Sequence, residues 1–119
     1  MDKRTTELAR ATVELGWSQR RPREAFLTLT DSIIAAGAMP RLNGSGALGL
    51  ADVAAGRTDA YVELHINLWD VAAALTILAE ARATVSDFMA GNGATAGNAI
   101  LASAPGIAGA LSAATSITL

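Results

Sequence analysis

The sequence lacks cysteine altogether and has little histidine or aromatic side chain: one His, two Trp, one Tyr and two Phe in 119 residues. Without cysteine, disulfide bonds and thiolate metal sites are excluded. The lone histidine, His65, has no partner at metal-ligand spacing, so we expect a surface or hydrogen-bonded structural role for it. Hydrophobic residues still make up 51% of the chain. The core is therefore expected to consist of Ala, Leu, Ile and Val packed at close backbone distances.

Charge is also scarce. The net charge of −2 argues against a nucleic-acid-binding surface. Arg20, Arg21 and Arg23 form the one basic cluster, which we interpret as a solvated loop and helix start in preference to a phosphate-binding site. The start Met1-Asp2-Lys3-Arg4 leads into a polar segment and not into an apolar signal core, so a cytoplasmic location is expected.

The last part of the chain has no Asp, Glu, Lys or Arg after Asp87. It is interrupted by Gly, Asn and Pro and is too weakly apolar for a membrane span of about 20 residues. We expect a buried strand and a closing helix here, and no membrane partner.

Strand-like and helical segments alternate along one domain, residues 1–119. Val62, Leu64 and Ile66 are predicted on one face of a strand, with Tyr61, Glu63 and His65 on the other. This order predicts an α/β fold, a layered α-β-α sandwich with a mixed sheet of about five strands. The predicted strands are 11–16, 39–43, 59–66, 84–88 and 99–104, and the predicted helices are 22–37, 45–56, one carrying Leu68 to Leu78, and 106–117.

Three features could carry chemistry, although each has an ordinary reading. Asp70 stands at the head of a helix, where an acid commonly caps backbone N–H groups, but Asn67 is an equally good cap. Glu63 lies on the polar face of its strand, where simple solvent exposure is the common case. Ser45, between Gly44 and Gly46, opens a helix whose N–H groups could receive a hydroxyl or an anion.

The order and spacing of these features resemble the C-terminal half of the inositol monophosphatase family, a metal-dependent sugar and inositol phosphatase superfamily. That family has a Gly-Ser/Thr-Ala-Ala helix start, then VAAG-x-x-D-x-Y, a strand Glu and WD-x-A-A. Here the corresponding stretches are 44–47, 53–61, Glu63 and 69–73. The likeness continues upstream through ATVELGW and the 22–37 helix, so it covers nearly the whole chain.

The resemblance implies specific roles for these residues. Asp70 would be a ligand of a catalytic Mg²⁺ and lie beside the substrate. Glu63 would accept hydrogen bonds from hydroxyls of the inositol or sugar leaving group. Gly44, Ser45 and Gly46 would line the same pocket, largely through backbone groups, and Gly46 in place of the family's Ala is expected to matter little if only the backbone contacts the substrate. A Mg²⁺-dependent phosphomonoesterase acting on a polyol or sugar monophosphate is the implied function.

Two departures qualify that implication. The family's N-terminal half supplies a metal-binding Glu and a D-P-[IL]-D-G-T loop, and neither occurs here. We therefore expect an incomplete chain, inactive alone, that forms a homodimer or associates with a separate N-terminal half. The family also has Glu-Ala-Gly-Gly where this chain has Glu80-Ala81-Arg82-Ala83, so the turn is built differently or is strained.

Two alternatives remain. The chain could be a non-catalytic remnant that serves as an interaction domain. It could also be an anion-binding module that uses the helix start at Ser45 and keeps its phosphate affinity in chelator.

Overall fold

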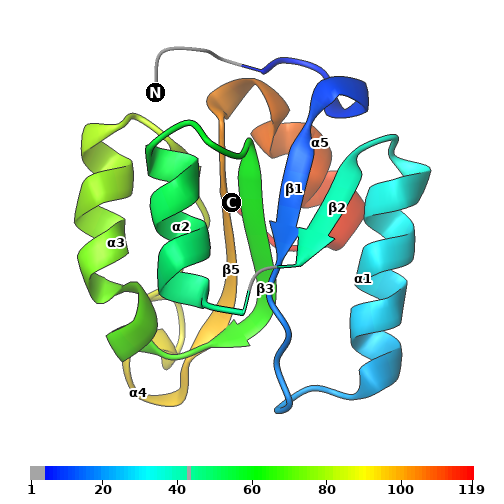
Figure 1. Ribbon diagram of the computed structural model, residues 1–119. Coiled ribbons are helices and arrows are strands. Elements are labelled where there is room, and N and C mark those ends of the chain that lie inside the picture. The colour runs from blue at the N-terminus through cyan, green and yellow to red at the C-terminus, as the bar shows by residue number, and fades with distance from the viewer. Residues whose placement is uncertain (1–4, 43) are drawn as a thin grey trace.

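The computed structural model describes residues 5–42 and 44–119, so predictions for Met1–Arg4 and for Asn43 lie outside the described residues. Figure 1 shows a central sheet with helices on both sides. The strands are β1 (Thr12–Leu15), β2 (Met39–Leu42), β3 (Ala60–Ile66), β4 (Thr84–Val85) and β5 (Asn98–Ser103). The helices are the 3-10 turn η1 (Leu8–Arg10), α1 (Arg23–Ala35), α2 (Gly46–Ala54), α3 (Leu68–Glu80), α4 (Gly93–Ala96) and α5 (Pro105–Thr115).

The sheet is mixed, as the sequence predicted. Its strand order is β2-β1-β3-β5-β4. Strands β2, β1 and β3 are parallel to one another, while β5 runs antiparallel to both β3 and β4. Parallel neighbours need a crossover connection, which α1 and α2 provide between successive parallel strands.

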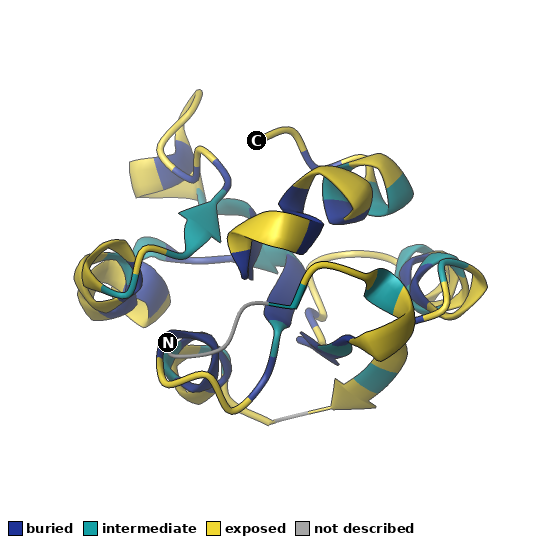
Figure 2. Ribbon diagram, turned by 90° about the horizontal axis from the view of Figure 1, so that it is seen from above, coloured by how far each residue is buried: buried dark blue, intermediate teal, exposed yellow. Residues whose placement is uncertain are grey.

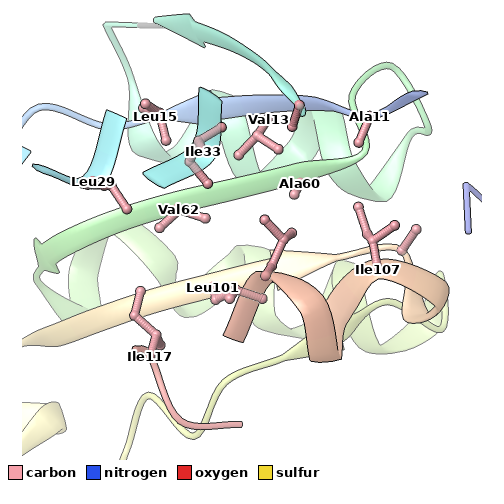
Figure 3. Packing of buried hydrophobic residues seen from close by; sticks show 13 residues of the cluster. Ala11, Val13, Leu15, Leu29, Ile33, Ala60, Val62, Leu101, Ile107 and Ile117 are labelled. Atoms are coloured by element: carbon pink, nitrogen blue, oxygen red, sulfur yellow. The ribbon is translucent and has the colours of Figure 1, made fainter. Parts of the chain in front are cut away.

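Two hydrophobic clusters, one on each face of the sheet, produce the layered sandwich. On one face, Leu29 and Ile33 of α1 and Ile107 of α5 pack with strand residues such as Val62, as Figure 3 shows. On the other face, α2 and α3 cover Tyr61. Figure 2 shows that the exposed residues of the helices face outward and that their buried residues face the sheet. Each fully buried Leu, Ile or Val stabilises this arrangement by about 1.5–3 kcal/mol.

Strand β3 departs from the predicted alternation at its end. Its pairing with β5 shifts between Glu63 and Ile66, because three steps along β3 correspond to two steps along β5. The extra residue forms a β-bulge, which reverses the facing of the residues that follow it. The prediction that Ile66 shares a face with Val62 was therefore wrong, since Ile66 packs in the cluster that contains Tyr61.

The uncharged C-terminal part is folded into the sandwich as expected. Strand β5 is the central partner of β3 and β4, and α5 packs on the sheet through Ile107, Ala108 and Leu111. The strand predicted at 84–88 is shorter, because β4 ends at Val85 and the Leu101 N–H then donates to the Ser86 side-chain hydroxyl, at 2.9 Å, and not to a main-chain carbonyl. Among the helices of the described ranges, none is long and apolar enough to span a bilayer.

Helix α3 ends in a strained version of a common turn. The N–H of Ala83 donates to the Leu78 carbonyl and that of Arg82 to the Ala79 carbonyl, the paired bonds of a Schellman motif. This motif needs a left-handed residue, and Arg82 adopts φ 61°. The corresponding residues after α1 and α2 are Gly37 and Gly56, with φ 96° and 77°. The turn is thus kept without its glycine, at a steric cost to the Arg82 backbone.

Arg82→Gly is expected to raise the free energy of unfolding by about 1 kcal/mol, because glycine adopts the left-handed region without a Cβ clash. Urea denaturation at pH 7 measures the change. The matched control is Ala83→Gly, at a position whose φ is not positive, and it should lower stability by about 0.5–1 kcal/mol. Equal effects of the two substitutions would contradict a strained Arg82.

Candidate functional site

The N-termini of two helices lie at one edge of the sheet. Strands β1 and β3 are parallel, so their carboxyl ends lie at the same edge. Helix α3 begins two residues after β3 ends, and α2 begins shortly after β2, which is parallel to β1. Figure 1 shows the starts of α2 and α3 at the lower edge, beside the arrowheads of β1 and β3. In open α/β sheets this edge is where ligands commonly bind.

A polar pocket of about 320 Å³ opens at this edge. Its volume is at the lower end of the range for small-molecule sites. The pocket brings together every site residue that the sequence singled out: Gly44, Ser45, Gly46, Glu63 and Asp70. Its other lining residues are Gly16, Trp17, Arg20, Tyr61 and Ile66. The phosphatase interpretation depends on this convergence, because it requires both acids on the side of the sheet where the Gly-Ser turn lies.

Glu63 is buried and not solvent-exposed, so the ordinary surface interpretation was wrong. Its exposed fraction is 7%, and that of Tyr61 is 0%. The Tyr61 hydroxyl donates a hydrogen bond of 2.6 Å to Glu63 Oε1. Helices α2 and α3 cover this face of β3, a tertiary arrangement that strand alternation alone does not reveal.

Three glycines pack against the Tyr61–Glu63 pair. A Cβ at Gly16 would lie 2.1 Å from the Tyr61 hydroxyl oxygen and 2.3 Å from Glu63 Oε1. A Cβ at Gly49 would lie 2.4 Å from Tyr61 Cδ1. At Gly46 it would lie 2.5 Å from Ile66 Cδ1, the far end of a flexible side chain. Ile66 reaches Gly46 because the β-bulge turns it to this face.

The pocket's electrostatics follow from its mixture of acids and one cation. Burial raises the pKa of Glu63, and the negative charge of Asp70 raises it further. The hydrogen bond from Tyr61 and the positive charge of Arg20 act in the opposite direction. Burial and the hydrogen bond to Glu63 raise the pKa of Tyr61 well above its usual range. Tyr61 is therefore protonated, and a donor, at any physiological pH.

Ser45 and Asp70 occupy helix starts as predicted. Ser45 is the N-cap of α2, and its hydroxyl accepts from the Leu48 N–H at 3.3 Å. Asn67 is the N-cap residue of α3, which places Asp70 in the first turn, where its side chain is exposed. An exposed carboxylate at a helix start remains accessible to a cation or a ligand.

Sequence reasoning did not assign five of the lining residues to the pocket: Gly16, Trp17, Arg20, Tyr61 and Ile66. Arg20 was interpreted as part of a solvated basic loop, in preference to a phosphate site, and it is exposed, but the loop lies over the pocket. The signal for Tyr61 was present, because residues two apart on a strand share a face. Trp17 belongs to the ATVELGW stretch that resembles the family, but it was given no role in the site; it packs edge-on against Phe26 at 4.9 Å between ring centroids.

Other motif residues have structural roles. Asp59 Oδ2 accepts from the Thr12 N–H at 2.8 Å, and its Oδ1 accepts from the Thr5 hydroxyl, so it ties the start of β1 to β3. His65 lies outside the pocket lining, and its Nε2 is 2.8 Å from the Ala96 carbonyl oxygen. His65 thus has the hydrogen-bonded structural role that the sequence indicated.

The raised pKa of Glu63 predicts a pH-dependent gain in stability for Glu63→Gln. A carboxyl whose pKa is higher in the folded state contributes most to stability below its unfolded pKa, and the contribution is lost as pH rises through the folded pKa. Gln keeps an acceptor for Tyr61 and carries no charge. We expect the variant to be more stable than the parent at pH 7, with the difference vanishing below about pH 4. Urea midpoints across pH 3–8 measure this, and a difference that is constant with pH would contradict it.

The pocket does not form a complete metal site from the residues described. In residues 5–42 and 44–119, no group of three or more His, Asp or Glu side chains is placed to hold a metal ion. Mg²⁺ prefers hard oxygen ligands in near-octahedral geometry, and the Asp70 carboxylate can supply one of these ligands. The donor set is therefore compatible with a contribution to a Mg²⁺ site and insufficient for a two-metal centre.

Comparison with known families agrees with the motif pattern and the geometry. The model of the inositol monophosphatase family matches residues 3–117. The chain belongs to this family. Among curated members, it is 52% identical over 73 residues to inositol-1-monophosphatase SuhB of Mycobacterium tuberculosis, a match covering 60% of this chain and 24% of that protein. It is 37% identical over 89 residues to the Nus factor SuhB of Vibrio cholerae, covering 75% of this chain and 33% of that protein.

Solved structures show the same inositol monophosphatase fold. Mycobacterium tuberculosis SuhB superposes with a TM-score of 0.80 at 39% identity, covering 94% of this chain and 43% of that one. The inositol monophosphatase from Anabaena superposes with a TM-score of 0.79 at 32% identity, covering 92% and 44%. The chain thus spans less than half the length of these relatives.

Proposed function

We propose that this chain is the substrate side of a Mg²⁺-dependent phosphomonoesterase of the inositol monophosphatase type. Its substrate class is inositol monophosphate or a related polyol or sugar monophosphate. The observation that carries the proposal is the meeting of Glu63, Asp70 and the Ser45 helix start around one polar pocket. Residues 1–119 form the C-terminal, substrate- and metal-side unit, and a cytoplasmic location is part of the proposal.

Each of the three features has a distinct task in this proposal. The buried Glu63 accepts hydrogen bonds from hydroxyls of the leaving polyol. The Gly44-Ser45-Gly46 turn contacts the same substrate through backbone groups. The first turn of α2 contains no acidic residue, so it does not repel an anion. Asp70 contributes one carboxylate to Mg²⁺, whose remaining protein ligands come from a second unit.

The chain alone is expected to be inactive, because one carboxylate holds Mg²⁺ weakly and paired metals are needed to stabilise both oxygens of an in-line displacement. The test is reconstitution with the part of Mycobacterium tuberculosis SuhB that this chain does not cover. The mixture, given Mg²⁺ and inositol monophosphate, should release phosphate, and each component alone should not. Phosphate release by this chain alone, or none from the mixture after complex formation is confirmed, would contradict the proposal.

The alternative is a non-catalytic interaction domain that dimerises or complements a separate unit. The edge strand β2 favours it, because Met39 and Leu42 are each 66% exposed there. Exposed apolar edge strands promote pairing with another chain. Sedimentation velocity and the reconstitution assay separate the two functions. A complex that forms and has no Mg²⁺-dependent turnover supports the alternative, and phosphate affinity that persists in EDTA supports an anion-binding module.

A further inference from the structure

We propose that Tyr61 is a positioning residue, whose hydroxyl fixes the Glu63 carboxylate in the orientation that receives the leaving polyol. The inference rests on the proposed function, and it assigns the selectivity for hydroxyl-bearing substrates to a pair of residues instead of to Glu63 alone.

The hydrogen bond between the two side chains carries the inference. Tyr61 donates to Glu63 Oε1 at 2.6 Å, a short distance typical of an O–H donor facing a charged oxygen. Both residues line the pocket. With Oε1 engaged by Tyr61, the other oxygen, Oε2, is the natural acceptor for a polyol hydroxyl. Fixing the carboxylate in advance lowers the entropy cost of binding.

The main chain holds Tyr61 in place. Its ring lies against the Cα of Gly49, where a Cβ would be 2.4 Å from Cδ1 and 2.5 Å from Cε1. Its hydroxyl lies against Gly16 and Gly46, where a Cβ would be 2.1 Å and 3.2 Å away. These contacts come from α2 and from Gly16, the residue that follows β1. Backbone atoms move less than side chains, so the position of the hydroxyl is set by the fold.

A neutral phenol suits this task better than a cation. Arg or Lys would pair with Glu63 and neutralise the acceptor that the polyol needs. Tyr61 orients the carboxylate and leaves its negative charge in place. Because Tyr61 is fully buried, and Glu14 and Asp70 add to the effect of Glu63 on it, its hydroxyl stays protonated and remains a donor.

The first experiment uses the isolated chain and needs no activity. Side-chain NMR couplings report the rotamer populations of Glu63 in the parent and in Tyr61→Phe, which keeps the ring and removes the donor. We expect one dominant rotamer in the parent and averaging over several in the variant. The control is Thr115→Val, which removes a hydroxyl bonded within α5 at 2.7 Å to the Leu111 carbonyl. A single unchanged Glu63 rotamer in Tyr61→Phe would overturn the inference.

The second experiment uses the reconstituted enzyme and two substrates. Tyr61→Phe should raise the KM for inositol monophosphate about fivefold to tenfold, with little change for p-nitrophenyl phosphate, whose leaving group has no hydroxyl beside the ester. In a Glu63→Gln background, the same change should add less than about twofold, because the two residues act as one unit. Equal losses with both substrates, or additive effects with Glu63→Gln, would show a merely structural tyrosine.

The two experiments fail in different ways. If Glu63 loses its fixed rotamer in Tyr61→Phe and the reconstituted parent enzyme hydrolyses neither substrate, the positioning contact is correct and the proposed function is wrong. If the enzyme is active and the selectivity between the two substrates does not change, the proposed function is correct and Tyr61 has no positioning role.

Discussion

Gly49→Ala is expected to lower the free energy of unfolding by about 2 kcal/mol, although alanine is the better helix former. The substitution gains up to about 1 kcal/mol of helix propensity inside α2. The new Cβ would, however, lie 2.4 Å from Cδ1 and 2.5 Å from Cε1 of Tyr61, whose ring is fully buried, so the ring or the helix would have to shift. Overpacking a well-filled core costs about 1–3 kcal/mol or more, which exceeds the propensity gain.

The matched control is Gly109→Ala in α5, where a Cβ would meet nothing within 4 Å. The same chemical change should there raise stability by about 0.5–1 kcal/mol. Urea or thermal denaturation of the two variants measures the difference in sign. If both variants were stabilised, the close approach of α2 to Tyr61 would be wrong, and the positioning of Glu63 would lose its support.

Asp70→Asn is expected to reduce kcat/KM of the reconstituted enzyme by at least about 100-fold. Asn keeps the size of the side chain and removes the charged oxygen ligand that Mg²⁺ prefers. The exposed Asp70 makes only a modest contribution to the fold, about 0.3–1 kcal/mol through the dipole of α3. Phosphate release from inositol monophosphate, measured across a Mg²⁺ titration, should therefore fall sharply while the unfolding transition moves little.

The control for this substitution is Asp31→Asn, at an exposed position on α1 outside the pocket lining. It removes the same charge from the other side of the sheet and should leave kcat/KM unchanged within about twofold. Equal activity of the Asp70→Asn enzyme and the parent would contradict a metal-ligand role for Asp70. The chain would then be better described as an interaction domain.

The order of the five strands and of the four longer helices along the chain was predictable because it depends on local pattern; the short elements η1 and α4 were not predicted. The spacing of Leu29 and Ile33, the cap at Ser45 and the alternation along β3 are short-range signals, and each marks an element that the structure contains. Membership of the inositol monophosphatase family also follows from linked motifs, and the family model confirms it. The left-handed turn after α3 was anticipated as a conflict, since Arg82 stands where a glycine would be unstrained.

The site's composition was predictable only in part. Gly44, Ser45, Gly46, Glu63 and Asp70 were named from motif order, and they do line one pocket. Arg20 and Trp17 were not predicted to be site residues, because the position of a loop over a site depends on packing between distant segments, which no local pattern encodes. The bulge in β3, which brings Ile66 against Gly46, was likewise not predicted, because the sequence of β3 reads as a regular strand whose residues alternate between the two faces.

By itself the sequence determined the order of the five strands and four longer helices, the family and the two acids that meet at the sheet edge, because periodicity, caps and motif spacing are properties of neighbouring residues. Only the tertiary structure decided that Glu63 is buried, that Tyr61 holds it and that three glycines leave room for both. Those facts depend on how closely α2 approaches β1 and β3, a distance set by packing between segments far apart in the chain.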